Sequence, residues 1–327
     1  MKTITKESLR IVFMGTPEFA VASLNALVEN RYNVVGVITM PDKGVGRGYK
    51  LQPSAVKQYA VSRGLTLLQP VSLKDPSFLE ELRALDADLQ IVVAFRMLPE
   101  AVWNMPPLGT FNLHASLLPQ YRGAAPINWA LINGEKETGV TTFFLSHEID
   151  TGRIILQEKT SIKDEDNAGM LHDRLMMMGA ELVVRTVDVI VEGSAASVSQ
   201  SELYEKEAVL RSAPKIFRET CRVEWNRRAD EVYNLIRGLS PYPAAWTELV
   251  TEQGGDPLRF KLFSADKVMD NHTLPAGTIR SDNKSFLEVA VSDGFIRITD
   301  LQLQGKRRMQ TGEFLNGYSF SEDACFS

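Results

Sequence analysis

The chain has 327 residues, of which 44% are hydrophobic and 24% are charged, with a formal net charge of −5. This composition is typical of a globular protein, and the length favours two domains because single cores stop growing near about 250 to 300 residues. No apolar run is long enough for a membrane helix, and residues 1–10 are polar, so we expect a cytoplasmic protein without a membrane partner. The two cysteines, Cys221 and Cys325, are far apart and predict neither a disulfide framework nor a metal cluster.

The first half of the chain predicts strands that alternate with helices. A short apolar run at Leu9–Met14 predicts a strand that ends at Gly15, and a helical pattern follows from Pro17. Apolar runs at Val34–Met40 and Leu89–Ala94 predict two further buried strands. Such alternation is typical of an α/β domain with a parallel sheet, Rossmann-like in its layout. Its ligands would lie beyond the carboxyl ends of the strands.

The turn after the first predicted strand argues against a dinucleotide site. Pro17 and Ala20 stand where the dinucleotide fingerprint requires glycine or, at the last position, sometimes alanine. Pro17 has no N–H and places a ring where a pyrophosphate would approach the backbone. No Walker sequence is present either. We therefore expect neither NAD binding nor a P-loop.

The second half predicts a small barrel. A helical pattern at Ala168–Glu192 leads into a polar stretch at Gly193–Glu207, and a shorter helical pattern follows at Ala229–Gly238. Short β-type runs come next, at Trp246–Val250, Leu258–Phe263, Leu287–Val291 and Phe295–Leu303. We expect a front domain at residues 1–204, a linker at 205–220 and a small β-barrel of the OB type at 221–327.

Asn112, His114 and Asp150 form the candidate catalytic group. Asn112 and His114 are two residues apart in a predicted strand, so their side chains share a face. An amide N–H can stabilise a developing oxyanion, and an imidazole can take a proton from an attacking amine. Asp150 could orient the imidazole, as the third member of a catalytic triad does.

Residue types alone leave these roles open. A single Asn on a strand usually satisfies backbone groups, a single His usually fills or caps, and Asp-Thr-Gly is an ordinary turn. His147, His172 and His272 are also present, and on residue type His147 competes with His114. Composition and spacing do not decide between these alternatives.

A series of short motifs runs in order along nearly the whole chain. They are Gly15-Thr16-Pro17-Glu18-Phe19, Pro41-Asp42-Lys43, Gln69-Pro70, Asn112-Leu113-His114, Tyr121-Arg122-Gly123, Asp150-Thr151-Gly152, Ala213-Pro214-Lys215, Ile236-Arg237-Gly238 and Pro241-Tyr242-Pro243. Together they resemble the methionyl-tRNA formyltransferase family. The Asn-x-His pair and the distant Asp are common to folate-dependent formyltransferases, whereas the match along the whole chain indicates the acceptor.

The resemblance implies an activity and a site. Asn112 would polarise the formyl oxygen, His114 would take the amine proton, and Asp150 would support His114. The donor would be 10-formyltetrahydrofolate, the acceptor the free amino group of methionyl initiator tRNA, and no metal would take part. The residues expected to contact folate are Phe95, Arg96, Met97, Ser116, Leu117, Leu118 and Pro119. Many relatives read Ala-Tyr-Gly-x-x-Leu-Pro where this chain has the shorter, arginine-containing Ala94–Pro99.

The resemblance also implies how tRNA is held. The loop Pro41–Pro53 contains three glycines with Arg47 and Lys50, and its composition alone is equally typical of a solvated turn. In the family this loop reaches the acceptor end of the tRNA, with the arginine most important. Lys215 opens a locally basic segment before the barrel and is the third expected tRNA contact. We expect the chain to act as a monomer.

Three other functions stay open at this point. The chain could be a formyltransferase for a purine precursor or an amino sugar, a folate hydrolase, or an RNA-binding protein without catalytic activity. The linker and second-domain motifs argue against the first of these. The intact Asn112, His114 and Asp150 argue against the last.

Overall fold

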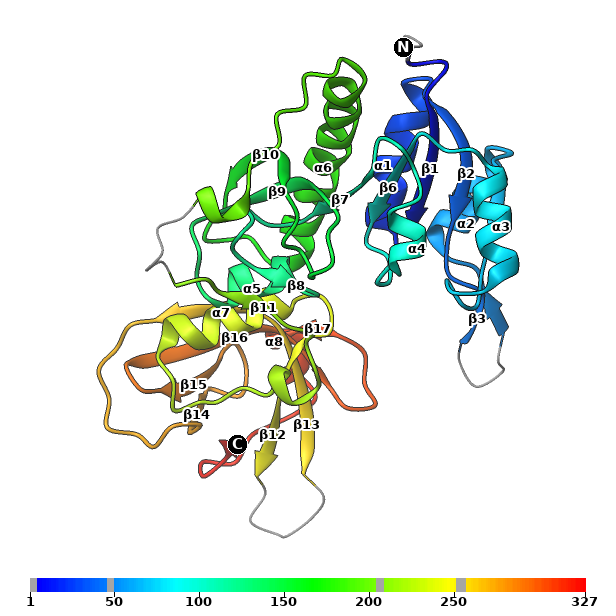
Figure 1. Ribbon diagram of the computed structural model, residues 1–327. Coiled ribbons are helices and arrows are strands. Elements are labelled where there is room, and N and C mark those ends of the chain that lie inside the picture. The colour runs from blue at the N-terminus through cyan, green and yellow to red at the C-terminus, as the bar shows by residue number, and fades with distance from the viewer. Residues whose placement is uncertain (1–4, 46–49, 204–208, 251–256) are drawn as a thin grey trace. The chain divides into compact units, whose positions relative to one another are not determined.

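The computed structural model describes residues 5–45, 50–203, 209–250 and 257–327, and the chain forms two compact units (Figure 1). Unit 1 comprises Met1–Gly123, Thr138–Thr160 and His172–Ser212, and unit 2 comprises Ala124–Glu137, Ser161–Leu171 and Ala213–Ser327. The chain thus passes between the units several times. The boundary predicted between residues 204 and 205 lies outside the described residues, so the predicted domain limits stay predictions.

A seven-stranded sheet forms the centre of unit 1. Its strands lie in the order β10 (Ile154–Ser161), β9 (Glu137–Phe144), β7 (Thr110–His114), β6 (Leu89–Val93), β1 (Arg10–Gly15), β2 (Asn33–Ile38) and β5 (Leu67–Leu68). The neighbours from β7 to β5 pair in parallel, and β9 pairs antiparallel to β7. The predicted α/β domain with a mainly parallel sheet is therefore confirmed.

Helices and one small hairpin follow these strands along the chain. The helices are α1 (Glu18–Glu29), α2 (Ala55–Ser62), α3 (Pro76–Ala84), α4 (Glu100–Trp103) and α6 (Ala168–Val191), and the hairpin consists of β3 (Lys43–Val45) and β4 (Lys50–Gln52). Local sequence explains where two of them begin. Asp75 caps α3 by accepting from the Ser77 N–H, with Pro76 in the first turn, and Ser54 caps α2 by accepting from the Lys57 N–H.

The core of unit 1 lies on both faces of the sheet. Val12 and Met14 of β1 pack in one cluster with Phe78 and Leu82 of α3. Phe13, between them in sequence, is fully buried and points to the opposite face. Because parallel strands are covered on both faces, their polar functional groups are expected at the carboxyl edge.

Unit 2 contains an antiparallel sheet that curls into a barrel. Its strands lie in the order β14 (Ile279–Ser281), β15 (Leu287–Val291), β16 (Gly294–Leu303), β13 (Leu258–Val268), β12 (Ala245–Val250) and β18 (Cys325–Phe326), and β17 (Met309–Gln310) pairs with β16. The two ends of this series meet. Thr278 and Cys325 form an antiparallel bridge, and the Phe326 N–H donates to the Gly277 carbonyl at 2.9 Å. This closure confirms the predicted small barrel.

Aromatic rings fill the barrel. Phe260 has its ring centroid 5.2 to 6.3 Å from those of four other aromatic residues, which are Phe314, Tyr318, Phe320 and Phe326. The helix α7 (Ala229–Leu239) adds Val232 and Ile236 to the same buried cluster. The remaining elements are β8 (Arg122–Gly123), α5 (Pro126–Ile132), β11 (Ser212–Ala213) and α8 (Thr311–Leu315), with short 3-10 turns at Gln200–Glu202 and Glu219–Cys221.

Within residues 5–45, 50–203, 209–250 and 257–327, no helix combines the length and the apolar character that crossing a membrane requires.

Candidate active site

The strand β7 carries both Asn112 and His114 at its carboxyl end, as the sequence predicts. The alternation of side chains along a strand puts them on the same face. His114 is 7% exposed, whereas Asn112 is half-buried. Among the described residues the Asn112 amide has no hydrogen-bond partner, so its N–H groups are available to a substrate oxygen.

The orientation of the His114 ring is set by a backbone carbonyl. Nε2 of His114 lies 2.8 Å from the carbonyl oxygen of Tyr121. A carbonyl only accepts, so Nε2 carries the proton and the neutral ring keeps Nδ1 as its basic nitrogen. Nδ1 lies 3.9 Å from Oδ2 of Asp150. A proton taken up at Nδ1 would therefore be stabilised by a nearby carboxylate.

Asp150 is held in place by the Gly123 backbone and by the geometry of its own turn. Its Oδ2 accepts from the Gly123 N–H at 2.9 Å, and its side chain is 14% exposed. The backbone of Asp150 has a φ of 54°, in the left-handed region that L-residues rarely adopt. Two residues later, a Cβ on Gly152 would lie 1.6 Å from the Phe144 carbonyl oxygen, so only glycine fits there. The structure thus brings Asp150 to His114 through a tightly determined turn.

Gln200 is a residue of this site that sequence reasoning missed. It is 2% exposed, and its Nε2 donates to the carbonyls of Asp150 at 2.8 Å and Gly152 at 2.9 Å. Its Oε1 accepts from Nη2 of Arg122 at 2.6 Å. The polar stretch around Gln200 has no periodicity, and a buried glutamine in it gives no sequence signal. Gln200 fixes the backbone of the loop that presents Asp150.

The expected folate segment Ser116–Pro119 follows β7 directly, at the same edge of the sheet. Ser116 is fully buried, and its hydroxyl donates to the Gln120 carbonyl at 2.6 Å. Leu118 is 2% exposed and its carbonyl accepts from Nε2 of Gln157 at 2.7 Å. Leu117 is half-buried and Pro119 is buried. The Ser116 hydroxyl is therefore already used inside the loop.

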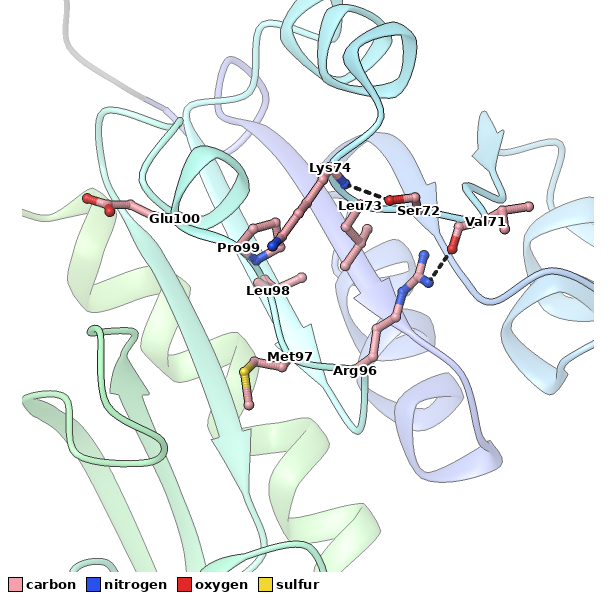
Figure 2. Close-up of a pocket in the computed structure, with 9 residues that line it drawn as sticks. All are labelled: Val71, Ser72, Leu73, Lys74, Arg96, Met97, Leu98, Pro99 and Glu100. Carbon is pink, nitrogen blue, oxygen red and sulfur yellow. Dashed lines mark hydrogen bonds between the residues drawn. The ribbon is translucent and has the colours of Figure 1, made fainter.

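The other expected folate residues, Phe95, Arg96 and Met97, follow β6. A pocket of about 550 Å³ lies here, and Figure 2 shows the residues that line it, which are Val71, Ser72, Leu73, Lys74, Arg96, Met97, Leu98, Pro99 and Glu100. The Arg96 guanidinium donates to the carbonyls of Pro70 at 2.5 Å and Val71 at 2.8 Å. Burial lowers the pKa of the Arg96 guanidinium. Phe95 is half-buried against the core, and Met97 is 74% exposed.

The other histidines do not form a comparable group. The His147 side chain is 74% exposed, with Nε2 3.9 Å from Oε1 of Glu100. His172 pairs with its sequence neighbour Asp173. Within the ranges that the structure describes, no three His, Cys, Asp or Glu side chains are grouped so that they could hold a metal ion.

The expected tRNA contacts are placed only in part. Arg47 lies outside the described residues, and Lys50 is the first residue of β4. Lys215 is exposed in unit 2, where its Nζ lies 5.6 Å from the ring centroid of Phe217, which is 58% exposed. In the same unit three guanidinium groups lie within 5.5 Å of the Trp246 ring centroid, those of Arg218, Arg222 and Arg259. Cationic groups thus lie over aromatic rings at two places in unit 2.

Comparisons with known proteins identify the family. Residues 9–187 match the family model described as formyl transferase, and residues 215–319 match the model for the formyl transferase C-terminal domain. A protein of Parabacteroides distasonis named methionyl-tRNA formyltransferase is 64% identical over 314 residues, which cover 96% of this chain and 97% of the relative. A protein of the same name from Flavobacterium johnsoniae is 54% identical over 318 residues, which cover 97% and 99%. The chain belongs to the methionyl-tRNA formyltransferase family.

Solved structures share the fold of this member of the methionyl-tRNA formyltransferase family. An N-formyltransferase from Helicobacter canadensis, solved with folinic acid and dTDP-3-aminofucose, has a TM-score of 0.63 at 20% identity and covers 92% of this chain and 100% of that one. HypX from Aquifex aeolicus, solved with tetrahydrofolic acid, has a TM-score of 0.61 at 18% identity and covers 94% and 48%. The family indicated by the sequence motifs is confirmed.

Proposed function

We propose that this chain transfers the formyl group of 10-formyltetrahydrofolate to the free amino group of methionyl initiator tRNA, for translation initiation. The observation that carries the proposal is the His114 ring, held between the Tyr121 carbonyl and the Asp150 carboxylate at the end of β7. The relatives named above, aligned over nearly their whole length, support the choice of acceptor. The two neighbours solved with folates support the choice of donor.

The chemistry follows from three side chains. The amine nitrogen forms a bond to the formyl carbon, and the bond from that carbon to the folate N10 breaks. Asn112 donates to the formyl oxygen as negative charge develops there, a contribution that typically amounts to about 10² to 10³ in rate. His114 takes the proton that the amine nitrogen loses, at Nδ1, and returns it to N10 of the leaving folate. Asp150 stabilises the imidazolium in between.

No metal is required in this proposal. The formyl group is already activated on the folate nitrogen, and the nucleophile is an amine. An α-amino group titrates near about 8, so a substantial fraction is neutral and nucleophilic at pH 7. The protein then has to position the two substrates and stabilise charge.

The two substrates would approach from loops around this group. We place the folate against Phe95, Arg96 and Met97 and against the segment Ser116–Pro119, where Arg96 acts through the loop it holds. We propose that Arg47 and Lys50 contact the acceptor arm of the tRNA and that Lys215 contacts phosphates from unit 2. The proposal includes a monomeric protein in the cytoplasm.

Initial rates of formylation test the proposal. Purified protein, 10-formyltetrahydrofolate and methionyl initiator tRNA should give formylmethionyl-tRNA, while uncharged initiator tRNA and methionyl elongator tRNA should give little or none. Equal formylation of the elongator and initiator tRNAs would overturn the acceptor assignment. Release of formate without transfer would favour a folate hydrolase instead.

A further inference from the structure

The short segment Gln69–Val71, which follows β5, is tied to its neighbours on two sides. On one side the Nε2 of Gln69 donates to Oδ1 of Asp42 and to the carbonyl of Met40, both at 2.9 Å. On the other side the guanidinium of Arg96 donates to the carbonyls of Pro70 and Val71. The three residues therefore lie between the base of the β3–β4 hairpin and the loop that lines the pocket in Figure 2.

Asp42 links this segment to both ends of the hairpin. Asp42 directly precedes β3, and its Oδ2 accepts from Nζ of Lys57 at 2.7 Å. Lys57 lies in α2, whose capping residue Ser54 comes shortly after β4. Hydrogen bonds from Lys57 and Gln69 lower the pKa of the Asp42 carboxyl, so it is charged at neutral pH. The carboxylate thus joins the chain before the hairpin to the chain after it.

Arg96 makes the link on the pocket side with a geometry that few side chains offer. Its two terminal nitrogens reach two successive carbonyls, and its Nε is buried without a partner among the described residues. A planar guanidinium can span two acceptors in this way, whereas an ammonium is a single point of contact. The same residue lines the pocket, so the position of its loop depends on Pro70 and Val71.

We propose that Gln69–Val71 is a strut between the two substrate sites, with Asp42, Gln69 and Arg96 as positioning residues. The inference rests on the proposed function, in which the segment of β3 and β4 meets tRNA and the loop 95–99 meets folate. Both loops are fastened to the same three residues, so a displacement at one is transmitted to the other. Binding of one substrate then changes the affinity for the other, and by the same factor in both directions, because thermodynamic coupling is reciprocal.

The strut predicts that one substitution affects both substrates. Gln69→Ala should raise KM for the folate and KM for the tRNA, each by about 5-fold, with little change in kcat, as expected for the loss of positioning hydrogen bonds. Gln69→Glu, which keeps the shape but puts a second carboxylate against Asp42, should act in the same direction. The matched control is Asn30→Ala, because Asn30 is an exposed amide that donates to the Ala26 carbonyl at 2.8 Å.

A double-mutant cycle tests whether Gln69–Val71 connects the two substrate-binding loops. Asp42→Ala and Arg96→Met should each raise both KM values, and their effects should combine non-additively, by a factor of about 3 or more, if one segment carries both. Arg63→Met, at an exposed arginine paired with Glu29, is the control for the loss of an arginine. The melting temperature of each variant separates misfolding from mispositioning, and Arg96→Lys should recover part of the loss if folding is intact.

The outcomes distinguish the strut from the proposed function. If the unaltered chain does not formylate methionyl initiator tRNA, the proposed function fails. If the unaltered chain is active but Gln69→Ala changes neither KM or only one of them, the strut is wrong and the function stands. Strictly additive effects of Asp42→Ala and Arg96→Met would also refute the strut.

Discussion

The carboxyl edge of the unit 1 sheet and the interior of the unit 2 barrel use buried side chains in opposite ways. At the sheet edge His114 and Gln200 are buried polar groups, each with a hydrogen-bond partner. In the barrel the buried Phe260 is surrounded by aromatic rings that pack against it. Buried polar groups cost free energy unless they are paired, so a buried imidazole between a carbonyl and a carboxylate marks where chemistry is expected. The contribution proposed for unit 2 lies on its outer surface, at the exposed Lys215.

The largest expected effect lies at the sheet edge. His114→Ala should lower kcat by about 10³-fold, because it removes the group that takes the amine proton. Initial formylation rates at saturating substrates measure this loss. His147→Ala, at an exposed histidine, should leave the rate unchanged. An active His114→Ala variant would show that His114 is not the base. An inactive His147→Ala variant would show that His147 is also required.

The barrel interior should respond in stability instead. Phe260→Ala should lower the free energy of unfolding by about 3 to 5 kcal/mol, since it empties the centre of a packed aromatic cluster. Urea titration followed by tryptophan fluorescence can detect this, because Trp225 stacks on Phe326 in the same core. At low temperature, where the variant is folded, kcat should be close to that of the unaltered protein. A large fall in kcat at low temperature would show that the barrel interior affects catalysis as well as stability.

A smaller effect is expected where a buried polar residue acts through its neighbour. Gln200→Ala should lower kcat by about 10-fold with little change in KM, because the Asp150 loop loses two hydrogen bonds. Gln302→Ala is the matched control, since Gln302 donates to the Lys306 carbonyl on the exposed side of the barrel. Equal kcat values for the two variants would show that the Asp150 loop does not depend on Gln200.

The smallest effect is expected on the outer surface of unit 2. Lys215→Ala should raise KM for tRNA by about 3-fold, leave kcat unchanged and reduce the slope of log KM against log salt by about 1, as expected for one phosphate contact. Lys284→Ala, at another exposed lysine of unit 2, should change neither value. A Lys215→Ala variant with an unaltered salt slope would exclude that contact.

Sequence patterns predict the strands of the unit 1 sheet better than the closure of the unit 2 barrel. The strands β1, β2 and β6 are continuous apolar runs, because both of their faces are covered, and each is visible in the sequence. The closure of the barrel is not visible, because it depends on a few residues at β14 and β18 that form no hydrophobic run. Strand alternation places Asn112 and His114 on one face, but the proximity of His114 to Asp150 depends on a turn that only the folded chain reveals.

The residues that connect the site to its surroundings were the hardest to predict. Gln200 reaches Asp150 from a polar stretch without periodicity, and its role depends on burial, which composition does not report. Arg96 was expected to line the folate pocket through its backbone, and nothing in the sequence indicates that its guanidinium donates to the carbonyls of Pro70 and Val71. Long-range side-chain to backbone hydrogen bonds of this kind leave no spacing rule in a single sequence.

The contact at Gly152 limits how this site can be redesigned. A methyl group there would collide with the Phe144 carbonyl oxygen of β9, so any larger residue would displace the turn that carries Asp150 away from β9. A library built to accept a different amine should therefore leave position 152 unchanged. Ile149, one residue before Asp150 and 60% exposed, offers side-chain variation in the same turn without that collision.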